Sequence, residues 1–148
     1  MTTHIAPVTI RDIMTPRPMT VGPKTSVRTL QHLFLAHGFN AFPVVDDAQI
    51  LLGIVTKLDV LRVVRHGSRR FLPDLSALWA EHVDDIMRRR VVTLAPDDPV
   101  ATAVDHMLSS RLRSLPVVEH PGPKALLIGM VSRGDVLGTV TILDESRG

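Results

Sequence analysis

Apolar residues recur at helical spacing in some stretches of this chain and form strand-like runs in others. The order of these stretches is the same in both halves. Between residues 27 and 34, and again between 100 and 107, apolar residues recur at the spacing of an amphipathic helix. Two β-branched runs around a turn come next, and then a second helical stretch from Lys57 or Arg133. The expected strands are Ala41 to Val45 with Ile50 to Val55, and Leu115 to Val118 with Ala125 to Val131. With a short extended piece before each first helix, at residues 19–21 and 92–94, the pattern predicts the order β-α-β-β-α twice.

Capping signals mark the start of each first helix. Asp98 precedes Pro99, so we expect Asp98 to be the N-cap and the proline to occupy the first helical position. Thr25 stands at the matching place in the first copy and is expected to cap its helix.

The chain is an internal repeat. Aligning the two halves pairs Asp12-Ile13-Met14 with Asp85-Ile86-Met87, and Gly53 to Leu61 with Gly129 to Leu137. A short insertion in the second copy falls within residues 120–124, where a turn is expected. Because a repeat fixes the architecture, we expect repeat 1 over residues 8–66 and repeat 2 over 83–143. The connector between them, residues 67–82, has the composition of a short helix at 74–79.

Composition places the chain among ordinary globular proteins. It has 148 residues, of which 45% are hydrophobic and 22% charged, enough for one domain or for two small units sharing a core. No apolar run reaches the length of a membrane span and the N-terminus lacks a signal peptide, so we expect no direct membrane insertion. The absence of cysteine excludes disulfides and thiol catalysis and fits a cytoplasmic location.

Several classes of function lose support on the same grounds. A net charge of +2 and 3% aromatic residues disfavour nucleic acid as a partner, because neither a basic surface nor a stacking platform is present. The seven histidines show no metal-ligand spacing, and the chain has no nucleophile elbow or phosphate-binding glycine loop of the Walker type. We therefore expect no catalytic residues and no metal site.

One motif in each repeat carries chemistry. The spacing Gly-x-x-Thr/Ser-x-x-Asp puts Thr56 or Ser132 where a strand runs into a helix, and Asp59 or Asp135 one turn later. Free amides and the helix dipole favour anionic oxygens there, and a carboxylate accepts the two hydroxyls of a ribose. The same spacing is also typical of a capping box, which needs no ligand. Both interpretations stay open at this point.

The repeated motifs as a set resemble the CBS (cystathionine β-synthase type) domain family. The resemblance rests on Asp-Ile-Met at each repeat start, on Phe42 to Asp46 and Leu115 to Glu119, and on the two Gly-to-Leu segments above, and it spans about residues 10–137. It implies an α+β fold in which two repeats pack as a pseudo-two-fold pair, a Bateman module, leaving two clefts. In such modules the clefts commonly bind AMP, ADP or ATP, and occasionally S-adenosylmethionine.

The resemblance also implies roles for individual residues. Asp59 and Asp135 match the acids that hold ribose. The phosphate-binding positions match Thr56, Lys57, Ser132 and Arg133, and the adenine pocket matches Asn40, Ala41, Pro43, Arg113, Ser114 and Pro116. Counting Arg88 to Arg90, Arg111 and Arg113, the second half is the more basic, and we expect the cleft with Ser132 and Asp135 to prefer more phosphates.

The resemblance therefore implies a regulatory module that senses an adenine nucleotide and transmits its occupancy to a partner protein. No catalytic cofactor is expected; the ligand is an adenosine-containing small molecule, and the chain is expected to form a homodimer. The alternative is a ligand-free dimerisation or docking module, because apolar helix faces near Val60 to Val64 and Val136 to Ile142 serve association equally well.

Overall fold

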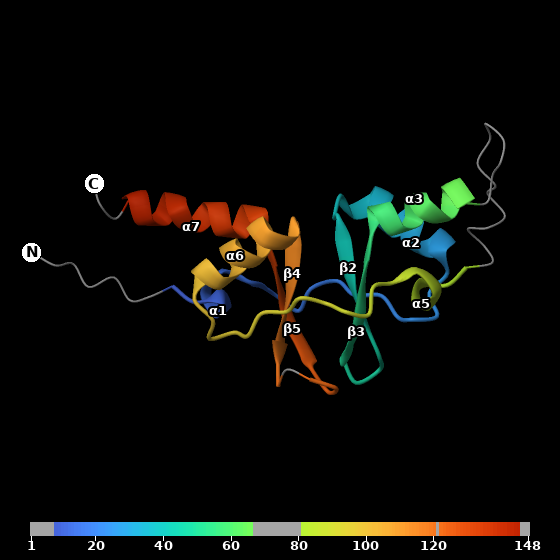
Figure 1. The fold of residues 1–148 in the computed structure, drawn as a ribbon, viewed down its shortest axis with the longest axis horizontal. Helices are drawn as coiled ribbons and strands as arrows, with labels where there is room; N and C mark the ends of the chain where they lie inside the picture. Colours follow the sequence, from blue (N-terminus) through green and yellow to red (C-terminus); the bar gives the residue numbers. More distant parts are fainter. Residues whose placement is uncertain (1–7, 67–80, 121, 146–148) are drawn as a thin grey trace, which may run out of the picture. The chain divides into compact units, whose positions relative to one another are not determined.

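The protein forms two compact units in a computed structural model that describes residues 8–66, 81–120 and 122–145. One unit comprises Met19–Val91 and is called the central unit. The other comprises Met1–Pro18 with Val92–Gly148 and is called the terminal unit. Both combine helices with antiparallel strands, so the α+β fold class is confirmed (Figure 1).

The central unit contains a two-stranded antiparallel sheet of β2 and β3. Its elements are α2 (Val27–His37), β2 (Ala41–Val45), β3 (Leu51–Thr56), α3 (Lys57–His66) and α5 (Val83–Ile86). The expected extended piece before α2 is present as a single parallel bridge, in which the Val21 amide donates to the Pro43 carbonyl at 3.1 Å. The predicted strand-helix-strand-strand-helix order is therefore confirmed for this repeat.

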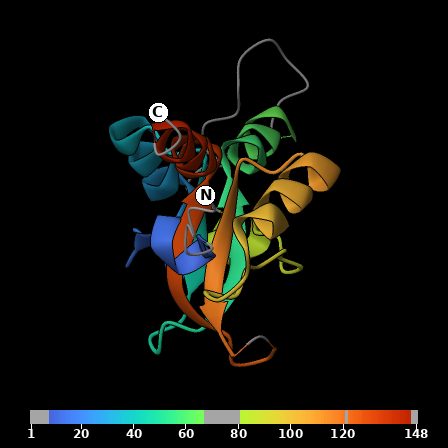
Figure 2. The same cartoon turned by 90° about the vertical axis from the view of Figure 1, so that its left-hand side faces the viewer.

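The terminal unit repeats that plan with one added strand. Its elements are α1 (Ile10–Ile13), β1 (Thr15–Pro16), α6 (Val100–Ser110), β4 (Ser114–Glu119), β5 (Leu126–Ser132) and α7 (Arg133–Glu145). The sheet order is β1-β5-β4, and Leu94 forms the parallel bridge that Val21 forms in the central unit. Figure 2 shows the β4–β5 turn at the end of the sheet opposite to α7, so the β5–α7 junction lies at the other end.

The leading segment of each sequence repeat packs in the unit that holds the other repeat's sheet. β1, from the start of repeat 1, pairs with β5 of repeat 2 through Thr15↔Met130 and Pro16↔Gly129. In the central unit the chain after α5 pairs with β3, where Ile54 and Arg88 exchange two backbone hydrogen bonds of 2.9 and 2.8 Å. The compact units therefore have boundaries different from those of the sequence repeats.

The aspartate of the repeated Asp-Ile-Met segment has a structural explanation. The Thr9 amide donates to Asp12 Oδ2 at 2.9 Å, and the His82 amide donates to Asp85 Oδ2 at 2.9 Å. Each carboxylate thus satisfies a free amide at the start of a one-turn helix, α1 or α5. The aspartates of this motif act as caps.

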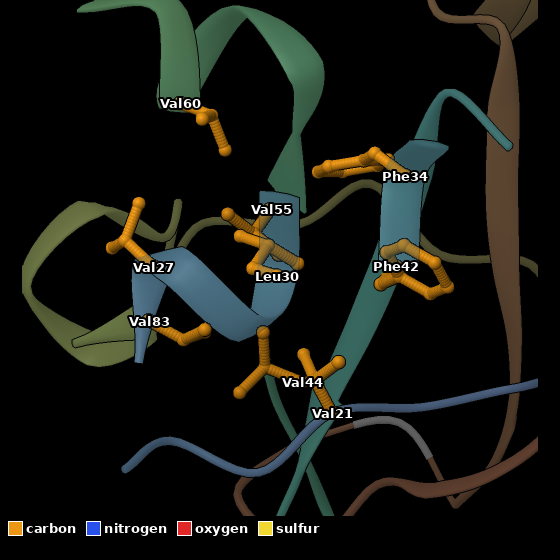
Figure 3. Close-up of a cluster of buried hydrophobic side chains, with 9 residues drawn as sticks. All are labelled: Val21, Val27, Leu30, Phe34, Phe42, Val44, Val55, Val60 and Val83. Carbon is orange, nitrogen blue, oxygen red and sulfur yellow. The ribbon is translucent and has the colours of Figure 1, made fainter. Parts of the chain in front are cut away.

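A separate apolar core fills each unit. In the central unit the buried side chains come from the segment before α2, from α2, both strands, α3 and α5; they are Val21, Val27, Leu30, Phe34, Phe42, Val44, Val55, Val60 and Val83 (Figure 3). The terminal unit buries Ile10, Leu94, Ala103, Met107, Leu115, Val117, Val131 and Val136. Ile10 and Val83 come from the exchanged leading segments, so each segment completes a core.

The caps of the two long first helices lie one residue later than expected. Ser26, not Thr25, is the N-cap of α2 and accepts from the Thr29 amide at 3.1 Å. At α6 the N-cap is Pro99 in an extended conformation, and Asp98 instead accepts from the Ala95 amide at 2.9 Å. Asp98 is therefore engaged in the preceding turn, and that prediction was wrong. The helix expected at residues 74–79 lies outside the described residues.

An exposed ion pair joins two segments of the central unit. Lys24 Nζ lies 2.8 Å from Asp84 Oδ2. This hydrogen bond is the main cause that lowers the pKa of Asp84 below its ordinary value of 3.8 and raises the pKa of Lys24 above 10.5. The pair therefore ties the start of α5 to the chain before α2.

We expect Asp84→Asn to lower the thermal midpoint slightly at pH 7, because it removes the ion pair with Lys24. The stabilisation by Asp84 is present above pH 3.8 and is lost as the pH falls through its lowered native pKa. The stabilisation by Lys24 is present below pH 10.5 and is lost above its raised native pKa. Midpoints of wild type and variant across this range check the prediction, with exposed Asp47→Asn as control; a difference unchanged at low pH would contradict it.

Candidate functional site

The predicted site residues gather where each hairpin runs into the following helix. In the central unit Ala41 is paired with Thr56, and the Lys57 amide donates to the Asn40 carbonyl at 3.2 Å. In the terminal unit Ser114 is paired with Ser132, and the Arg133 amide donates to the Arg113 carbonyl at 3.1 Å. These two places are called the β3–α3 junction and the β5–α7 junction. Each junction brings five of its six predicted residues from one repeat to the same end of one sheet, and the sixth, Pro43 or Pro116, lies two residues further along its strand.

The hydroxyl and the acid at each junction form the capping arrangement that was the alternative interpretation. Asp59 Oδ2 accepts from the Thr56 amide at 2.8 Å and from Thr56 Oγ1 at 2.9 Å. Asp135 Oδ2 accepts from the Ser132 amide at 2.8 Å, and the Asp135 amide donates to Ser132 Oγ at 3.1 Å. The cap uses one carboxylate oxygen of each aspartate. It leaves Oδ1 of each available for other partners.

Asp59 has two arginine neighbours on that second oxygen. Arg62 Nη1 lies 2.9 Å from Asp59 Oδ1, and Arg88 Nε lies 3.8 Å from the same atom. The Asp59 side chain is only 4% exposed, whereas both arginine side chains are about half exposed. The sequence analysis did not identify Arg62 or Arg88 as part of this site, although Arg62 stands one helical turn after Asp59.

Asp135 has a different environment. It is half buried, and among the described residues its side chain has no ion pair. Gly138 stands at the position that corresponds to Arg62, and Thr15 at the position that corresponds to Arg88. The two junctions therefore share the same backbone and cap but differ in the charge next to the acid.

The two cations predicted to bind phosphate also differ. Lys57 is exposed at the first residue of α3. Arg133 donates from Nε to the Leu112 carbonyl at 3.0 Å and from Nη2 to the Arg111 carbonyl at 3.2 Å. The guanidinium thus closes the C-terminal end of α6, where Arg111 adopts a left-handed conformation (φ 54°). In this geometry Arg133 supports the α6 end.

The residues matched to an adenine pocket fall into two groups. Asn40 and Arg113 are exposed, and Ala41 and Ser114 are half buried, at the first positions of β2 and β4 or just before them. Pro43 and Pro116 are buried further along the strands, where their carbonyls accept from the Val21 and Leu94 amides. The first group is accessible to a ligand, and the prolines hold the strands in place.

The expectation that repeat 2 has the more basic site is wrong for Arg88 to Arg90. These residues belong to the central unit, because the leading segment of repeat 2 pairs with β3. Arg88 approaches Asp59, and Arg89 Nη2 donates to the Asp84 carbonyl at 3.2 Å. The arginines closest to a junction acid therefore lie beside Asp59 and not beside Asp135.

An apolar hollow of about 410 Å³ lies over α6 and α7 of the terminal unit. It is lined by Val104, Met107, Leu108, Arg111, Arg133, Val136 and Leu137. Among the described residues no group of three histidine and acidic side chains is placed to hold a metal ion. No helix in the described part of the chain is long and apolar enough to cross a membrane.

Comparison with known proteins places these features in a family. The CBS domain matches the chain twice, over residues 10–66 and 83–141. The chain is 29% identical over 127 residues to a homoserine O-acetyltransferase of Methanococcoides burtonii; the match covers 86% of this chain but 23% of that enzyme. It therefore spans less than a quarter of that relative.

Two solved structures cover most of the chain. CBSX2 from Arabidopsis thaliana, solved in complex with AMP, is 28% identical with a TM-score of 0.77, and the match covers 92% of this chain and 98% of CBSX2. The CBS domain pair of MJ0100, solved with methylthioadenosine and S-adenosylmethionine, is 22% identical with a TM-score of 0.74; the match covers 91% and 97% and shows the fold alone. This chain belongs to the CBS domain family and carries two tandem copies of the domain.

Proposed function

We propose that this chain is a non-catalytic regulatory module that binds an adenosine-containing ligand, AMP, ADP or ATP, at its strand–helix junctions. The observation that carries the proposal is the pairing of a hydroxyl with an acid at the start of a long helix, present in both repeats. Membership of the CBS family supports it, as does the likeness over 92% of the chain to a CBS pair solved with AMP.

The chemistry of the junction suits the two polar parts of such a ligand. Ribose hydroxyls donate hydrogen bonds, and a carboxylate oxygen accepts them: Oδ1 of Asp135, or Oδ1 of Asp59 where the ligand displaces Arg62. Phosphate oxygens are favoured near Thr56, Lys57, Ser132 and Arg133, because the positive end of the helix dipole and the charges of Lys57 and Arg133 attract anions. The base would meet the start of β2 or β4, near Asn40 and Ala41 or near Arg113 and Ser114.

Regulation requires more than binding. A ligand shifts a partner's activity only if it binds two states of the module with different affinity. We propose that occupancy changes the geometry of the repeats and that a regulated protein, in the same or another chain, responds to it. S-adenosylmethionine, which also carries an adenosine, is the second ligand class to test.

A thermal-shift panel of AMP, ADP, ATP and S-adenosylmethionine tests the proposal on protein freed of nucleotide. At 100 times its dissociation constant a ligand stabilises the fold by about 2.7 kcal/mol, which raises the midpoint by roughly 5 °C or more. We expect this shift with at least one adenosine ligand and none with inorganic phosphate or adenine alone. A flat panel at millimolar concentrations would contradict the proposal and favour the docking module.

Self-association is a second proposed property, supported by leucines at matching positions of both repeats. Among the described residues, four of the helix leucines that are more than half exposed stand at matching positions: Leu35 and Leu61 in the central unit, Leu108 and Leu137 in the terminal unit. Leu108 and Leu137 line the apolar hollow over α6 and α7. Exposed apolar groups of this kind mark interaction surfaces, and we propose that they form a homodimer.

We expect the double variant Leu108→Asp with Leu137→Asp to be monomeric in light scattering at concentrations where the wild type is dimeric. Charged groups in a buried apolar interface lose their hydration without gaining partners. Asp105→Asn, which changes an exposed side chain on the same helix α6, is the control. A dimer unchanged by the double variant would exclude this surface.

A further inference from the structure

We infer that the two junctions differ in their affinity for ligand. Arg62 forms an ion pair with Asp59, the acid of the β3–α3 junction, so a ligand with vicinal hydroxyls binds preferentially at the β5–α7 junction, through Asp135. The inference rests on the proposed function, since it decides which of the two junctions performs it.

The Asp59 carboxylate already accepts three hydrogen bonds from the protein, of the roughly four that its two oxygens can accept. Oδ2 receives the Thr56 amide and hydroxyl at 2.8 and 2.9 Å, and Oδ1 receives Arg62 Nη1 at 2.9 Å. With the side chain 4% exposed, a ligand hydroxyl reaches Oδ1 only by displacing the guanidinium. The guanidinium brings a full positive charge to this carboxylate as well as a hydrogen-bond donor, whereas a ribose hydroxyl brings only the donor, so the hydroxyl is a poor competitor for that position.

The Asp135 carboxylate has room for the same hydroxyls. Within the described residues its one accepted bond comes from the Ser132 amide, at 2.8 Å on Oδ2. Its side chain is half buried, not fully buried, and no arginine or lysine forms an ion pair with it there. Oδ1 of Asp135 therefore keeps the acceptor capacity that a ribose needs.

The difference has a local cause in two residues. α3 carries Arg62 one turn after Asp59, and α7 carries Gly138 at the matching place. A Cβ atom built on Gly138 meets nothing within 4 Å, so this position is open space. The second cation near Asp59, Arg88, corresponds to uncharged Thr15 beside β5. Arg62 is thus a specificity-determining residue, acting by occupying an acceptor that the other junction leaves open.

The pair of reciprocal substitutions Arg62→Gln and Gly138→Arg tests the inference, with AMP as the probe in isothermal titration of the full chain. For wild type we expect one AMP per chain to bind at least about tenfold more tightly than any second. Arg62→Gln should strengthen the second site about tenfold or more, and Gly138→Arg should weaken the first by a similar factor. Asp135→Asn should abolish the tighter binding.

Matched controls separate charge at the acid from effects on folding. Arg65→Gln removes another exposed arginine from α3, and Gly138→Ala adds a side chain without charge; both should leave AMP affinity within about twofold. Thermal midpoints of every variant show that the helices are intact.

Three outcomes would overturn the inference while leaving the proposed function standing. They are two equivalent AMP sites in wild type, tighter binding that survives Asp135→Asn, and weaker AMP binding in Arg62→Gln, which would make Arg62 a phosphate ligand. Absence of AMP binding in wild type and in every variant, together with a flat panel of the other adenosine ligands, would instead overturn the proposed function and the inference with it.

Discussion

Gly53→Ala is expected to destabilise the central unit by about 3 kcal/mol, at the upper end of the range for overpacked sites. A Cβ at this position would lie 2.6 Å from the Arg88 carbonyl oxygen and 2.9 Å from Met87 Sδ. The carbonyl cannot move away without loss of the bond it accepts from the Ile54 amide, which is 2.9 Å long. The substitution therefore separates the leading segment of repeat 2 from β3. Urea unfolding of the full chain, followed by circular dichroism, measures the change.

Gly129→Ala supplies the matched comparison in the terminal unit. A Cβ at position 129 would lie 2.6 Å from Met14 Sδ, which is part of a flexible side chain. The nearest backbone atom, the Thr15 carbonyl oxygen, would be 3.1 Å away. We expect a smaller loss of about 1 kcal/mol, because the methionine can rotate. Gly138→Ala, with open space around it, should gain up to about 1 kcal/mol from helix propensity. Equal stability of Gly53→Ala and wild type would contradict the pairing of this segment with β3.

Phe42→Ala is expected to cost about 3 to 5 kcal/mol, the range for removal of a buried aromatic side chain. Phe42 is fully buried in the core of the central unit and packs against Phe34 at a ring-centroid distance of 4.8 Å (Figure 3). Its ring also meets Phe39 edge to face at 5.7 Å. Truncation removes these contacts and leaves a cavity between α2 and β2. Urea unfolding of the full chain measures the loss.

Phe42→Leu is the informative control, because repeat 2 carries Leu115 at the corresponding position and buries it completely. We expect Phe42→Leu to cost roughly 1 to 1.5 kcal/mol, well below the alanine variant, since most of the volume is kept. A loss for leucine as large as that for alanine would show that the aromatic contacts themselves, and not the filling of space, hold this core together.

The hydrophobic pattern predicted the elements within each repeat closely. β2 runs over Ala41–Val45 as expected, and α3 and α7 begin at Lys57 and Arg133. These elements follow from short-range periodicity, because each depends on residues three to seven positions apart. The α2 and α6 caps were placed one residue early, since by residue type Thr25 is nearly as suitable an N-cap as Ser26 and Asp98 is a more suitable one than Pro99.

The hydrophobic pattern could not predict that the leading segment of each repeat packs in the unit that holds the other repeat's sheet. Gly53 and Gly129 stand at matching strand positions, which indicates that another backbone segment approaches closely there. The glycines do not indicate which segment it is. The choice between two similar sheets depends on contacts far apart in the sequence, such as Ile54 with Arg88. For the same reason Arg88 was assigned to the wrong half of the molecule.

At the candidate site, spacing predicted the local geometry but not the charges around it. The bonds between Thr56 and Asp59 follow from a strand that ends where a helix begins. Arg62 lies within the same helix and was recognisable as an ion-pair partner from its spacing of one turn. The difference between Arg62 and Gly138, which stand at matching positions, could be interpreted only after the structure showed that Asp59 and Asp135 form the same cap.

The most direct test of ligand binding at the two junctions is an AMP titration of the isotopically labelled chain, followed by the backbone amide resonances. We expect saturable shifts centred on Ser132, Arg133 and Asp135, with weaker and later shifts at Thr56 to Asp59, and loss of the first set in Asp135→Asn. Absence of any saturable shift at either junction with AMP, ADP or ATP at millimolar concentrations would contradict it.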